Sequence, residues 1–175
     1  MICGSMFSGK TEELIRRLRR AVIANQKVAI FKPALDERYS KDEVVSHDMR
    51  SVSSILVHHP DEIPAKAEDA DVIAIDEAQF FSNALVRVVQ DLALNGRRVI
   101  IAGLDMDFNA NAFGPVPELL AIAEYVTKLH AICAECGSLA HHSFRMDSNM
   151  EQILIGEKDK YKPLCRSCYH RLKTS

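Results

Sequence analysis

The sequence lacks the features of a membrane protein and of a protein that holds nucleic acid by charge. No apolar run among its 175 residues approaches the roughly 20 residues that a membrane-spanning helix needs. The net charge of -2 provides no overall basic field to attract nucleic acid. No signal peptide is visible either. We therefore expect a cytoplasmic protein with neither a membrane partner nor a nucleic-acid partner.

Internal repeats and low-complexity tracts are also absent, and cysteine is sparse. The contents of 47% hydrophobic and 26% charged residues are ordinary for a globular protein, and the length suits one domain with an appendage. Four of the five cysteines form two C-x-x-C pairs, whereas Cys3 stands alone. In a reducing compartment, such pairs indicate a bound metal more than disulfide bonds.

A phosphate-binding motif, G-x-x-x-x-G-K-[ST], lies near the beginning of the chain. Its glycines let the backbone curl so that amides converge on phosphate oxygens, and the following helix adds its positive end. Lys10 is placed to reach the outer phosphates, and the Thr11 hydroxyl is placed to bind Mg²⁺. The motif residues are Gly4, Ser5, Met6, Phe7, Ser8, Gly9, Lys10 and Thr11.

The sequence predicts the helix after this motif more clearly than the strand before it. After it, Leu14, Leu18 and Val22 recur every fourth residue, which is typical of an amphipathic helix. Before it, Ile2-Cys3 supplies only the last step of a strand, so we expect a strand that has lost its first residues. The alternative is a chance glycine-rich turn before an amphipathic helix.

Three short apolar runs, at 28–31, 72–75 and 99–102, alternate with helical spacing along the chain. Fully apolar strands separated by helices predict an α/β fold, with a parallel sheet covered by helices on both faces. Together with the phosphate motif, this pattern predicts a P-loop NTPase fold. Ligands gather at the carboxyl ends of such strands, where the motif would meet Asp76-Glu77 and Leu104-Asp105.

The acidic pair Asp76-Glu77, which follows the second predicted strand, is a candidate for metal binding and catalysis. Asp76 stands where a carboxylate holds Mg²⁺ directly or through water. Beside it, Glu77 could orient a substrate hydroxyl, as in a kinase, or a water molecule, as in an NTPase. Spacing alone does not choose between these, and Glu77 could also simply cap the helix that follows.

The C-x-x-C pairs, Cys133/Cys136 and Cys165/Cys168, predict a structural zinc site with four sulfur ligands. Unliganded thiols, a redox pair or a contribution from His170 are the alternatives. The long excursion between the pairs suits a lid that a metal pins at its base. We also expect a helix from Pro117, a strand over 126–132, and surface or packing roles for the other histidines.

Several stretches together resemble the type II thymidine kinases, the zinc-containing cytosolic class. They are Gly4 to Leu14, Asp76-Glu77-Ala78-Gln79-Phe80-Phe81, Gly103-Leu104-Asp105-Met106-Asp107-Phe108, the two cysteine pairs and Asp159-Lys160-Tyr161. The resemblance implies a nucleotide-binding α/β domain over residues 1–130 and a zinc-binding domain with a lasso lid over residues 131–175. It implies phosphate transfer from ATP to thymidine, giving dTMP for nucleotide salvage.

The resemblance also implies roles for individual residues. Glu77 would be the general base for the thymidine 5′-hydroxyl. ATP and its Mg²⁺ would be bound by the phosphate motif with Asp36, Glu37, Arg38, Asp76, Glu77, Ala78 and Gln79, and Thr11 and Asp76 would hold the magnesium. Thymidine would be bound by Met6, Leu104, Phe108, Ser143, Arg145, Gln152, Ile153, Leu154, Ile155, Gly156 and Tyr161.

The family further suggests a homotetramer and feedback inhibition by dTTP. Two segments depart from its pattern: residues 109–112 are less basic than usual, and Ser143 replaces the commoner threonine. A rival interpretation remains open from the residues themselves, namely an ATPase that grips nucleic acid through a zinc ribbon. The acidic net charge and the absence of a basic and aromatic stripe count against it.

Overall fold

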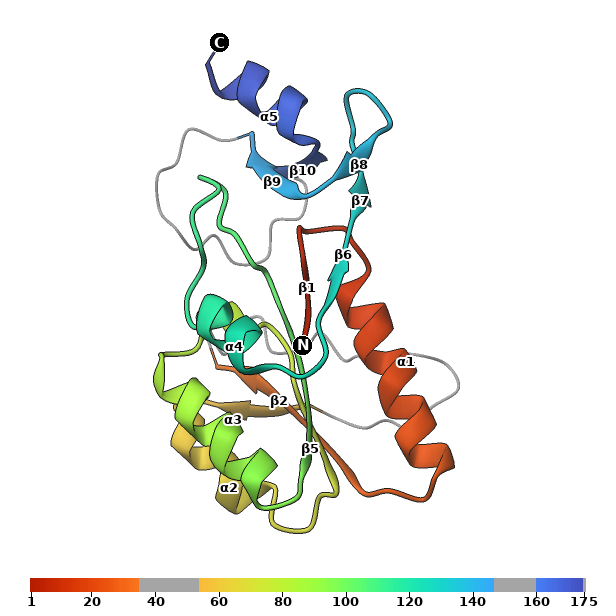
Figure 1. The fold of residues 1–175 in the computed structure, drawn as a ribbon, viewed down its shortest axis with the longest axis vertical. Coiled ribbons are helices and arrows are strands. Elements are labelled where there is room, and N and C mark those ends of the chain that lie inside the picture. Colours follow the sequence, from red (N-terminus) through yellow and green to blue (C-terminus); the bar gives the residue numbers. More distant parts are fainter. Residues whose placement is uncertain (35–53, 147–159, 175) are drawn as a thin grey trace.

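The computed structural model describes residues 1–34, 54–146 and 160–174 (Figure 1). Its main feature is a six-stranded sheet with the strand order β3-β2-β4-β5-β1-β6. Every pairing in this sheet is parallel. The strands are β1 (Ile2–Gly4), β2 (Val28–Pro33), β3 (Ile55–Val57), β4 (Val72–Ile75), β5 (Arg98–Gly103) and β6 (Thr127–Leu129).

Helices cover both faces of the sheet, as predicted (Figure 1). They are α1 (Lys10–Ile23), α2 (Ile63–Lys66), α3 (Ala84–Leu94) and α4 (Val116–Ile122), with short 3-10 turns η2 (Pro60–Glu62) and η3 (Ala78–Phe80). Helix α1 packs on one face, and α2, α3 and α4 pack on the other.

Strand β4 shows why the apolar runs could be recognised in the sequence. Val72 and Ala74 belong to the hydrophobic cluster beneath α1, whereas Ile73 and Ile75 belong to the cluster beneath α2, α3 and α4. All four are completely buried, because successive side chains of a strand point to opposite faces. A strand buried on both sides has no polar positions, which is the pattern that predicted it.

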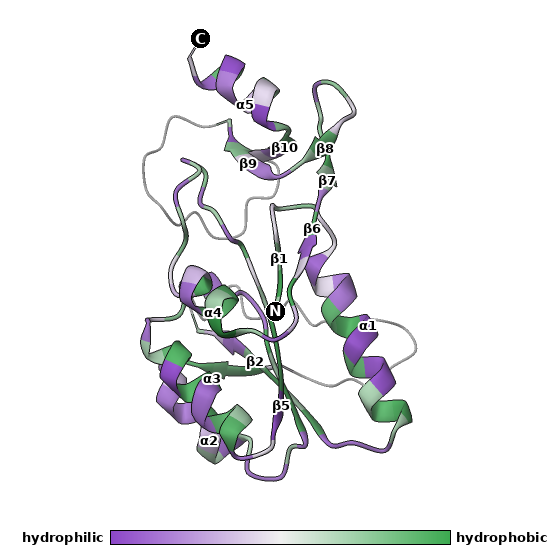
Figure 2. Ribbon diagram, in the orientation of Figure 1, coloured by the Kyte–Doolittle hydropathy of each residue, from purple (hydrophilic) through white to green (hydrophobic). Residues whose placement is uncertain are grey.

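The distribution of hydropathy follows the same layers. Hydrophobic residues concentrate in the strands of the large sheet, whereas α1 carries hydrophilic residues along much of its length (Figure 2). Among the described residues, no helix is both long and apolar enough to cross a membrane.

The prediction of one strand over 126–132 was wrong. Thr127–Leu129 forms β6 in the large sheet, beside β1, whereas Ala131–Ile132 forms β7 and pairs with another strand altogether. The chain leaves the sheet at His130, so one alternating stretch serves two separate structures. The motif's preceding strand, in contrast, is present: β1 has three residues and pairs on both sides, with β5 and with β6.

The C-terminal part has its own small core. It contains the hairpin of β7 (Ala131–Ile132) and β8 (Leu139–Ala140), the antiparallel pair β9 (His142–Arg145) and β10 (Tyr161–Leu164), and helix α5 (Arg166–Lys173). We call these elements the cysteine module. Its core is a third hydrophobic cluster, comprising Ala131, Cys133, Ala140, Leu164, Cys168 and Tyr169. In Figure 1 the module stands beyond the carboxyl ends of β1 and β5.

Candidate active site

The phosphate loop joins β1 to α1, and its backbone requires glycine at two points. Gly9 is the N-cap of α1 and has a left-handed φ of 82°. Gly4 has a φ of 142°, and a Cβ atom there would lie 2.3 Å from the Leu129 carbonyl oxygen of neighbouring β6. These are conformations that L side chains rarely adopt. The glycine spacing of the motif therefore has a direct structural reason.

Polar contacts hold this loop closed. The Ser5 carbonyl oxygen accepts hydrogen bonds from Ser8 Oγ and from Lys10 Nζ, each at 2.8 Å. Burial lowers the pKa of Lys10, while the carboxylates of Glu77 and Asp76 act in the opposite direction. Among the described residues, Ser5 Oγ is a buried polar atom without a hydrogen-bond partner. The loop thus presents a lysine and an unpaired hydroxyl next to acidic side chains.

Asp76 lies at the carboxyl end of β4 and is 3% exposed. The amide of Glu77 donates to its Oδ1 at 3.0 Å, and Lys32 Nζ lies 3.7 Å from its Oδ2. Burial, followed by the neighbouring charge of Glu77, raises the pKa of Asp76 to about 6, although Lys32 opposes this shift. A buried carboxylate that resists ionisation gains most from a nearby cation, so this position suits a metal ligand.

Glu77 adopts an unusual backbone conformation just after β4. Its φ is 55°, in the left-handed region that few non-glycine residues occupy. It precedes η3, yet in the described structure its side chain makes no capping hydrogen bond to that turn. Instead, Glu77 Oε2 accepts a hydrogen bond of 2.6 Å from Gln79 Nε2. The structure therefore does not support the alternative in which Glu77 is a helix cap.

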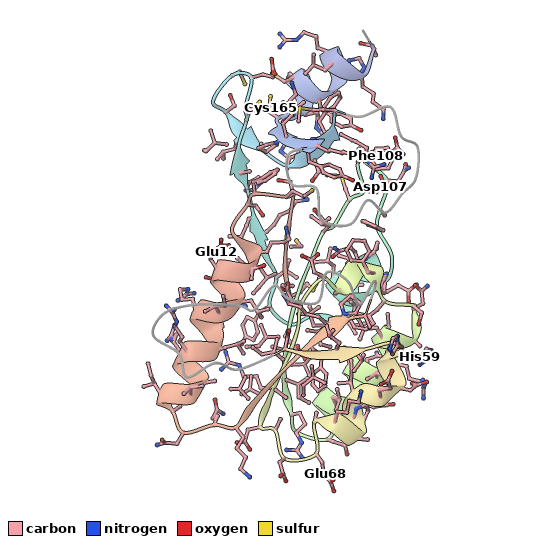
Figure 3. The ribbon with its side chains drawn as sticks, turned by 180° about the vertical axis from the view of Figure 1, so that it is seen from behind. Glu12, His59, Glu68, Asp107, Phe108 and Cys165 are labelled. Atoms are coloured by element: carbon pink, nitrogen blue, oxygen red, sulfur yellow. The ribbon has the colours of Figure 1, made fainter. Side chains whose placement is uncertain are left out.

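A second group of side chains lies where the loop after β5 meets the cysteine module (Figure 3). The guanidinium carbon of Arg145 lies 3.7 Å from the centre of the Phe108 ring. Arg145 also donates two hydrogen bonds to the Tyr161 hydroxyl. The hydroxyl of Tyr169, on α5, donates to the Phe108 carbonyl oxygen at 2.7 Å. These contacts join the Phe108 loop to β9, β10 and α5.

One hydrogen bond connects the cysteine module directly to the phosphate loop. The Met6 amide donates to Ser143 Oγ at 3.0 Å, across 137 residues of sequence. Ser143 lies on β9 and is buried. Residues that the sequence assigned to the nucleoside and to the phosphates are therefore in contact.

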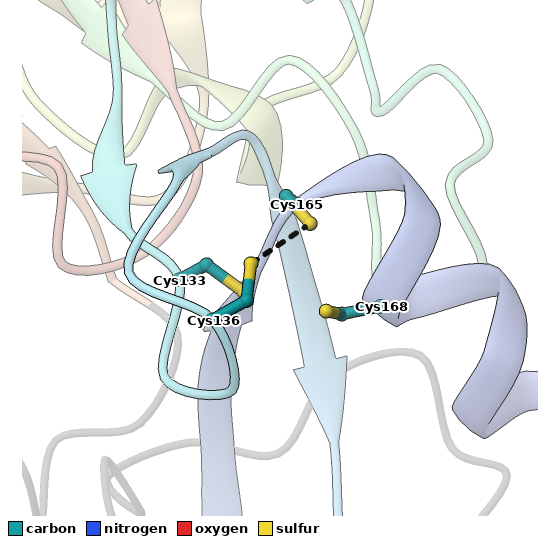
Figure 4. A group of neighbouring side chains, drawn as sticks. All are labelled: Cys133, Cys136, Cys165 and Cys168. Carbon is teal, nitrogen blue, oxygen red and sulfur yellow. Dashed lines mark hydrogen bonds between the residues drawn. The ribbon is translucent and has the colours of Figure 1, made fainter.

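The four paired cysteines come together as predicted (Figure 4). Within the described ranges, they form a group whose sulfur atoms all lie within 4.8 Å of one another. The Sγ atoms of Cys136 and Cys165 are 3.6 Å apart, and all five cysteines of the chain are free. A tetrahedral ion with Zn–S bonds of about 2.3 Å would separate its sulfur ligands by about 3.8 Å, so the group fits one such ion.

The surroundings of the thiols favour charge on one side of the cluster. Burial disfavours the Cys133 thiolate, but backbone N–H donors of Cys165, Glu135 and Cys136 outweigh burial and lower its pKa to about 6. Burial raises the pKa of Cys168 to about 12. A metal ion would stabilise all four thiolates at once. His170 does not belong to this group among the described residues.

The comparisons with known proteins agree with this geometry. A model of the family described as thymidine kinase matches residues 1–169. The chain is 57% identical over 173 residues to a thymidine kinase of Bacteroides thetaiotaomicron, covering 99% of this chain and 87% of that protein. It is 56% identical over 171 residues to a thymidine kinase of Porphyromonas gingivalis, covering 98% and 84% respectively.

This chain belongs to the thymidine kinase family. Among solved structures, AMPPCP-bound DnaA from Aquifex aeolicus matches with a TM-score of 0.46 and 17% identity, over 74% of this chain and 39% of that chain. A similarity at this level has no bearing on function.

The structure brings together most of the residues that the sequence assigned to this family's site. The phosphate loop, Asp76, Glu77 and Leu104 lie at the carboxyl ends of neighbouring strands. Phe108, Arg145 and Tyr161 form a cluster at the cysteine module. Eight assigned residues lie outside the described residues: Asp36, Glu37, Arg38, Gln152, Ile153, Leu154, Ile155 and Gly156.

Sequence reasoning missed two lysines that complete the charge balance of the site. Lys32, the last residue but one of β2, lies beside Asp76, and Lys128 Nζ lies 2.6 Å from Asp105 Oδ2. Lys32 lies on β2, the neighbour of β4, whereas Lys128 lies on β6 and reaches past β1 to the acid that follows β5. The sheet order pairs β2 with β4, and that order was the information needed to find Lys32.

Proposed function

We propose that this chain transfers the γ-phosphate of ATP to the 5′-hydroxyl of thymidine and so produces dTMP for nucleotide salvage. One observation carries the proposal: in a chain of this family, Lys10 of the phosphate loop lies close enough to Asp76 and Glu77 for their charges to act on it. Family membership favours this reaction over the alternative of a zinc-ribbon ATPase that binds nucleic acid.

ATP is bound at the phosphate loop. Backbone amides of residues 4–11 surround the phosphates, and Lys10 exchanges its contact with the Ser5 carbonyl oxygen for the outer phosphates. Mg²⁺ is held by the Thr11 hydroxyl and by Asp76, whose burial beside two lysines and Glu77 suits a cation-binding carboxylate. The segment Asp36–Arg38 is assigned to the phosphates by family resemblance.

The reaction needs one base. Glu77 accepts the proton of the thymidine 5′-hydroxyl as that oxygen attacks the γ-phosphorus, and the bond from phosphorus to the β,γ-bridging oxygen breaks. ADP leaves with the electrons of that bond, and the proton passes from Glu77 to solvent. Two observations support this role: the charge of Glu77 acts on Lys10, and Gln79 links Glu77 to the Leu104 amide just after β5.

Thymidine lies between the strand ends and the cysteine module. Phe108 and Tyr161 provide apolar walls, Met6 and Leu104 lie toward the phosphates, and Ser143 and Arg145 approach the sugar. The segment 152–156 is assigned to the base by family resemblance. The Phe108, Arg145 and Tyr161 cluster supports this placement because it joins a loop of the sheet to two strands of the module.

The four cysteines hold a structural Zn²⁺. A closed sphere of four sulfur ligands leaves no position for substrate, so this ion supports the fold and takes no part in the reaction. We also propose a cytoplasmic homotetramer that is inhibited by dTTP, because the family suggests both properties.

The test is a phosphate-transfer assay with labelled ATP and thymidine. We expect labelled dTMP from the wild type, and in Glu77→Gln a kcat lower by about 10²-fold or more, since a general base is lost. ATP affinity should be retained. The control is Glu124→Gln, which neutralises an exposed carboxylate elsewhere. Undiminished kcat in Glu77→Gln would contradict the assigned role, and failure of the wild type to form dTMP would overturn the proposed function.

A further inference from the structure

The carboxamide of Gln79 is hydrogen-bonded at both ends inside the molecule. Gln79 lies in η3 and is 2% exposed. Its Oε1 accepts a hydrogen bond from the Leu104 amide at 2.9 Å, and its Nε2 donates to Glu77 Oε2 at 2.6 Å. One side chain thus connects the proposed base to the backbone that follows β5.

The direction of these two bonds is fixed by chemistry. The Leu104 amide can only donate, so the atom facing it must be the carboxamide oxygen. The NH₂ group of Gln79 therefore faces Glu77, whose ionised carboxylate can only accept. A carboxylate held by one donor on one oxygen loses the freedom to rotate that oxygen toward another partner.

The surroundings of Gln79 leave its side chain and backbone little room to move. A Cβ atom on Gly103 would lie 3.0 Å from Gln79 Oε1, and a Cβ atom on Gly114 would lie 2.2 Å from the Gln79 carbonyl oxygen. A glycine at the end of β5 and a glycine in the loop before α4 therefore pack directly against this residue. Such close packing restricts η3 and the carboxamide to the observed position.

We propose that Gln79 is a positioning residue for Glu77. The family resemblance instead assigns Gln79 to ATP binding, and we propose that it does not bind the nucleotide. Gln79 engages Oε2 of Glu77, so Oε1 is the oxygen that receives the proton from the 5′-hydroxyl. Through the Leu104 amide, Gln79 also keeps this carboxylate in register with the end of β5, on the side where thymidine is placed. The inference rests on the proposed function, because it assigns a partner to the base of that reaction.

The decisive variant is Gln79→Glu, which preserves the size of the side chain and an acceptor for the Leu104 amide. It replaces the donor that faces Glu77 with an oxygen, so the carboxylate of Glu77 loses its fixed position. We expect kcat to fall by about 10-fold or more, since small displacements of a reacting group are costly. The Kd for ATP, measured by calorimetry, should stay within about twofold. Gln90→Glu is the matched control, because it makes the same change on the exposed side of α3 and should keep full activity.

A mutant cycle with Glu77→Gln separates positioning from a general structural role. If Gln79 acts through Glu77, Gln79→Glu lowers kcat in the wild-type background and causes no further loss in the Glu77→Gln background. Equal losses in both backgrounds would overturn the inference in favour of a structural role. Unchanged kcat with a raised Kd for ATP would overturn it in favour of a nucleotide contact.

Gln79→Met provides the same measurements if Gln79→Glu does not fold, since it keeps the volume and removes both hydrogen bonds. Thermal unfolding of each variant identifies the folded fraction to which kcat is referred. The failure of the proposed function is visible separately, because the wild type would then form no dTMP. An active wild type with a fully active Gln79→Glu would sink only the positioning role.

Discussion

The sheet edge that carries the phosphate loop, Asp76 and Glu77 holds its functional side chains differently from the cysteine module. We call it the phosphate-loop edge. The edge is built on a sheet with a hydrophobic cluster on each face, and Asp76 and Glu77 follow β4, whose four residues are completely buried. The module has short strands, and two of its buried core residues, Cys133 and Cys168, are themselves thiols of the four-cysteine group. The comparison predicts that the proposed ATP side depends on hydrophobic packing, whereas the proposed thymidine side depends on a metal held by the four cysteines.

Removal of the metal should have the largest effect, and that effect should be confined to the cysteine module. In Cys168→Ser, or after chelation, we expect the module to lose its structure and thymidine to bind at least about 10-fold more weakly. Structural zinc contributes about 10 kcal/mol or more to such folds. ATP binding at the loop should persist, and metal analysis of the wild type should find about one zinc per chain. Cys3→Ala is the control, since that thiol lies outside the group; equal loss of both ligands in Cys168→Ser would contradict the division of roles.

The next effect tests the sheet side. Gly4→Ala should reduce the free energy of unfolding by about 3 kcal/mol, because a Cβ atom would lie 2.3 Å from the Leu129 carbonyl oxygen and φ is 142°. Gly96→Ala is a matched control: its φ is 77°, but nothing lies within 4 Å of the added atom. It should cost only about 1 kcal/mol, for the left-handed backbone. Urea unfolding measures both, and similar losses would show that the close approach to β6 is unimportant.

The module should also respond to pH through His142, which is 4% exposed and stacks on Tyr169. Burial, then the charges of His141 and Arg166, lower the pKa of His142 from 6.5 to about 4, against the opposing charge of Asp105. As the pH falls below 6.5, the unfolded chain takes up a proton that the folded chain does not bind until about pH 4.

His142 therefore contributes stability above pH 6.5 that is lost between about pH 6.5 and 4, by roughly 3 kcal/mol. His142→Phe should flatten this part of the stability profile, measured by denaturant unfolding at each pH. His130→Gln, at an exposed position, should leave the slope unchanged. If His142→Phe and the wild type show the same slope, the neutral state of the buried imidazole is not the cause.

The smallest expected effect concerns the bond between the two regions. Ser143→Ala removes the acceptor of the Met6 amide and should cost about 1 kcal/mol of stability, with a modest rise in the KM for thymidine. Ser143→Thr keeps the hydroxyl and should retain the wild-type KM. Steady-state kinetics compares the two variants, and a similar rise in both would point to side-chain size instead of the hydrogen bond.

The parts of the fold that could be predicted are those whose cause lies within a short stretch of sequence. β4 is apolar because both of its faces are buried, and the phosphate loop has a fixed pattern because Gly4 and Gly9 need positive φ. The cysteine pairs could be predicted because four thiols at that spacing suit one ion. Family resemblance then identified the reaction class that the residues alone left open.

The parts that could not be predicted depend on contacts between distant segments. The stretch 126–132 alternates as one strand would, but its first half pairs with β1 and its second half with β8. Gln79 looked like part of a nucleotide motif because its partner Leu104 is 25 residues away in sequence. The division of the chain near residue 130 remains a prediction, as do the roles of 36–38 and 152–156.

The conformation of Glu77 has a consequence for how this chain can change over evolution. A left-handed backbone at a residue with a side chain costs about 1 kcal/mol or more, a strain that glycine would avoid. Glycine has no carboxylate, so relief of the strain and loss of the proposed base would occur together. Selection for stability and selection for catalytic activity thus oppose each other at position 77. Thermostable variants should therefore gain their stability from substitutions elsewhere in the chain.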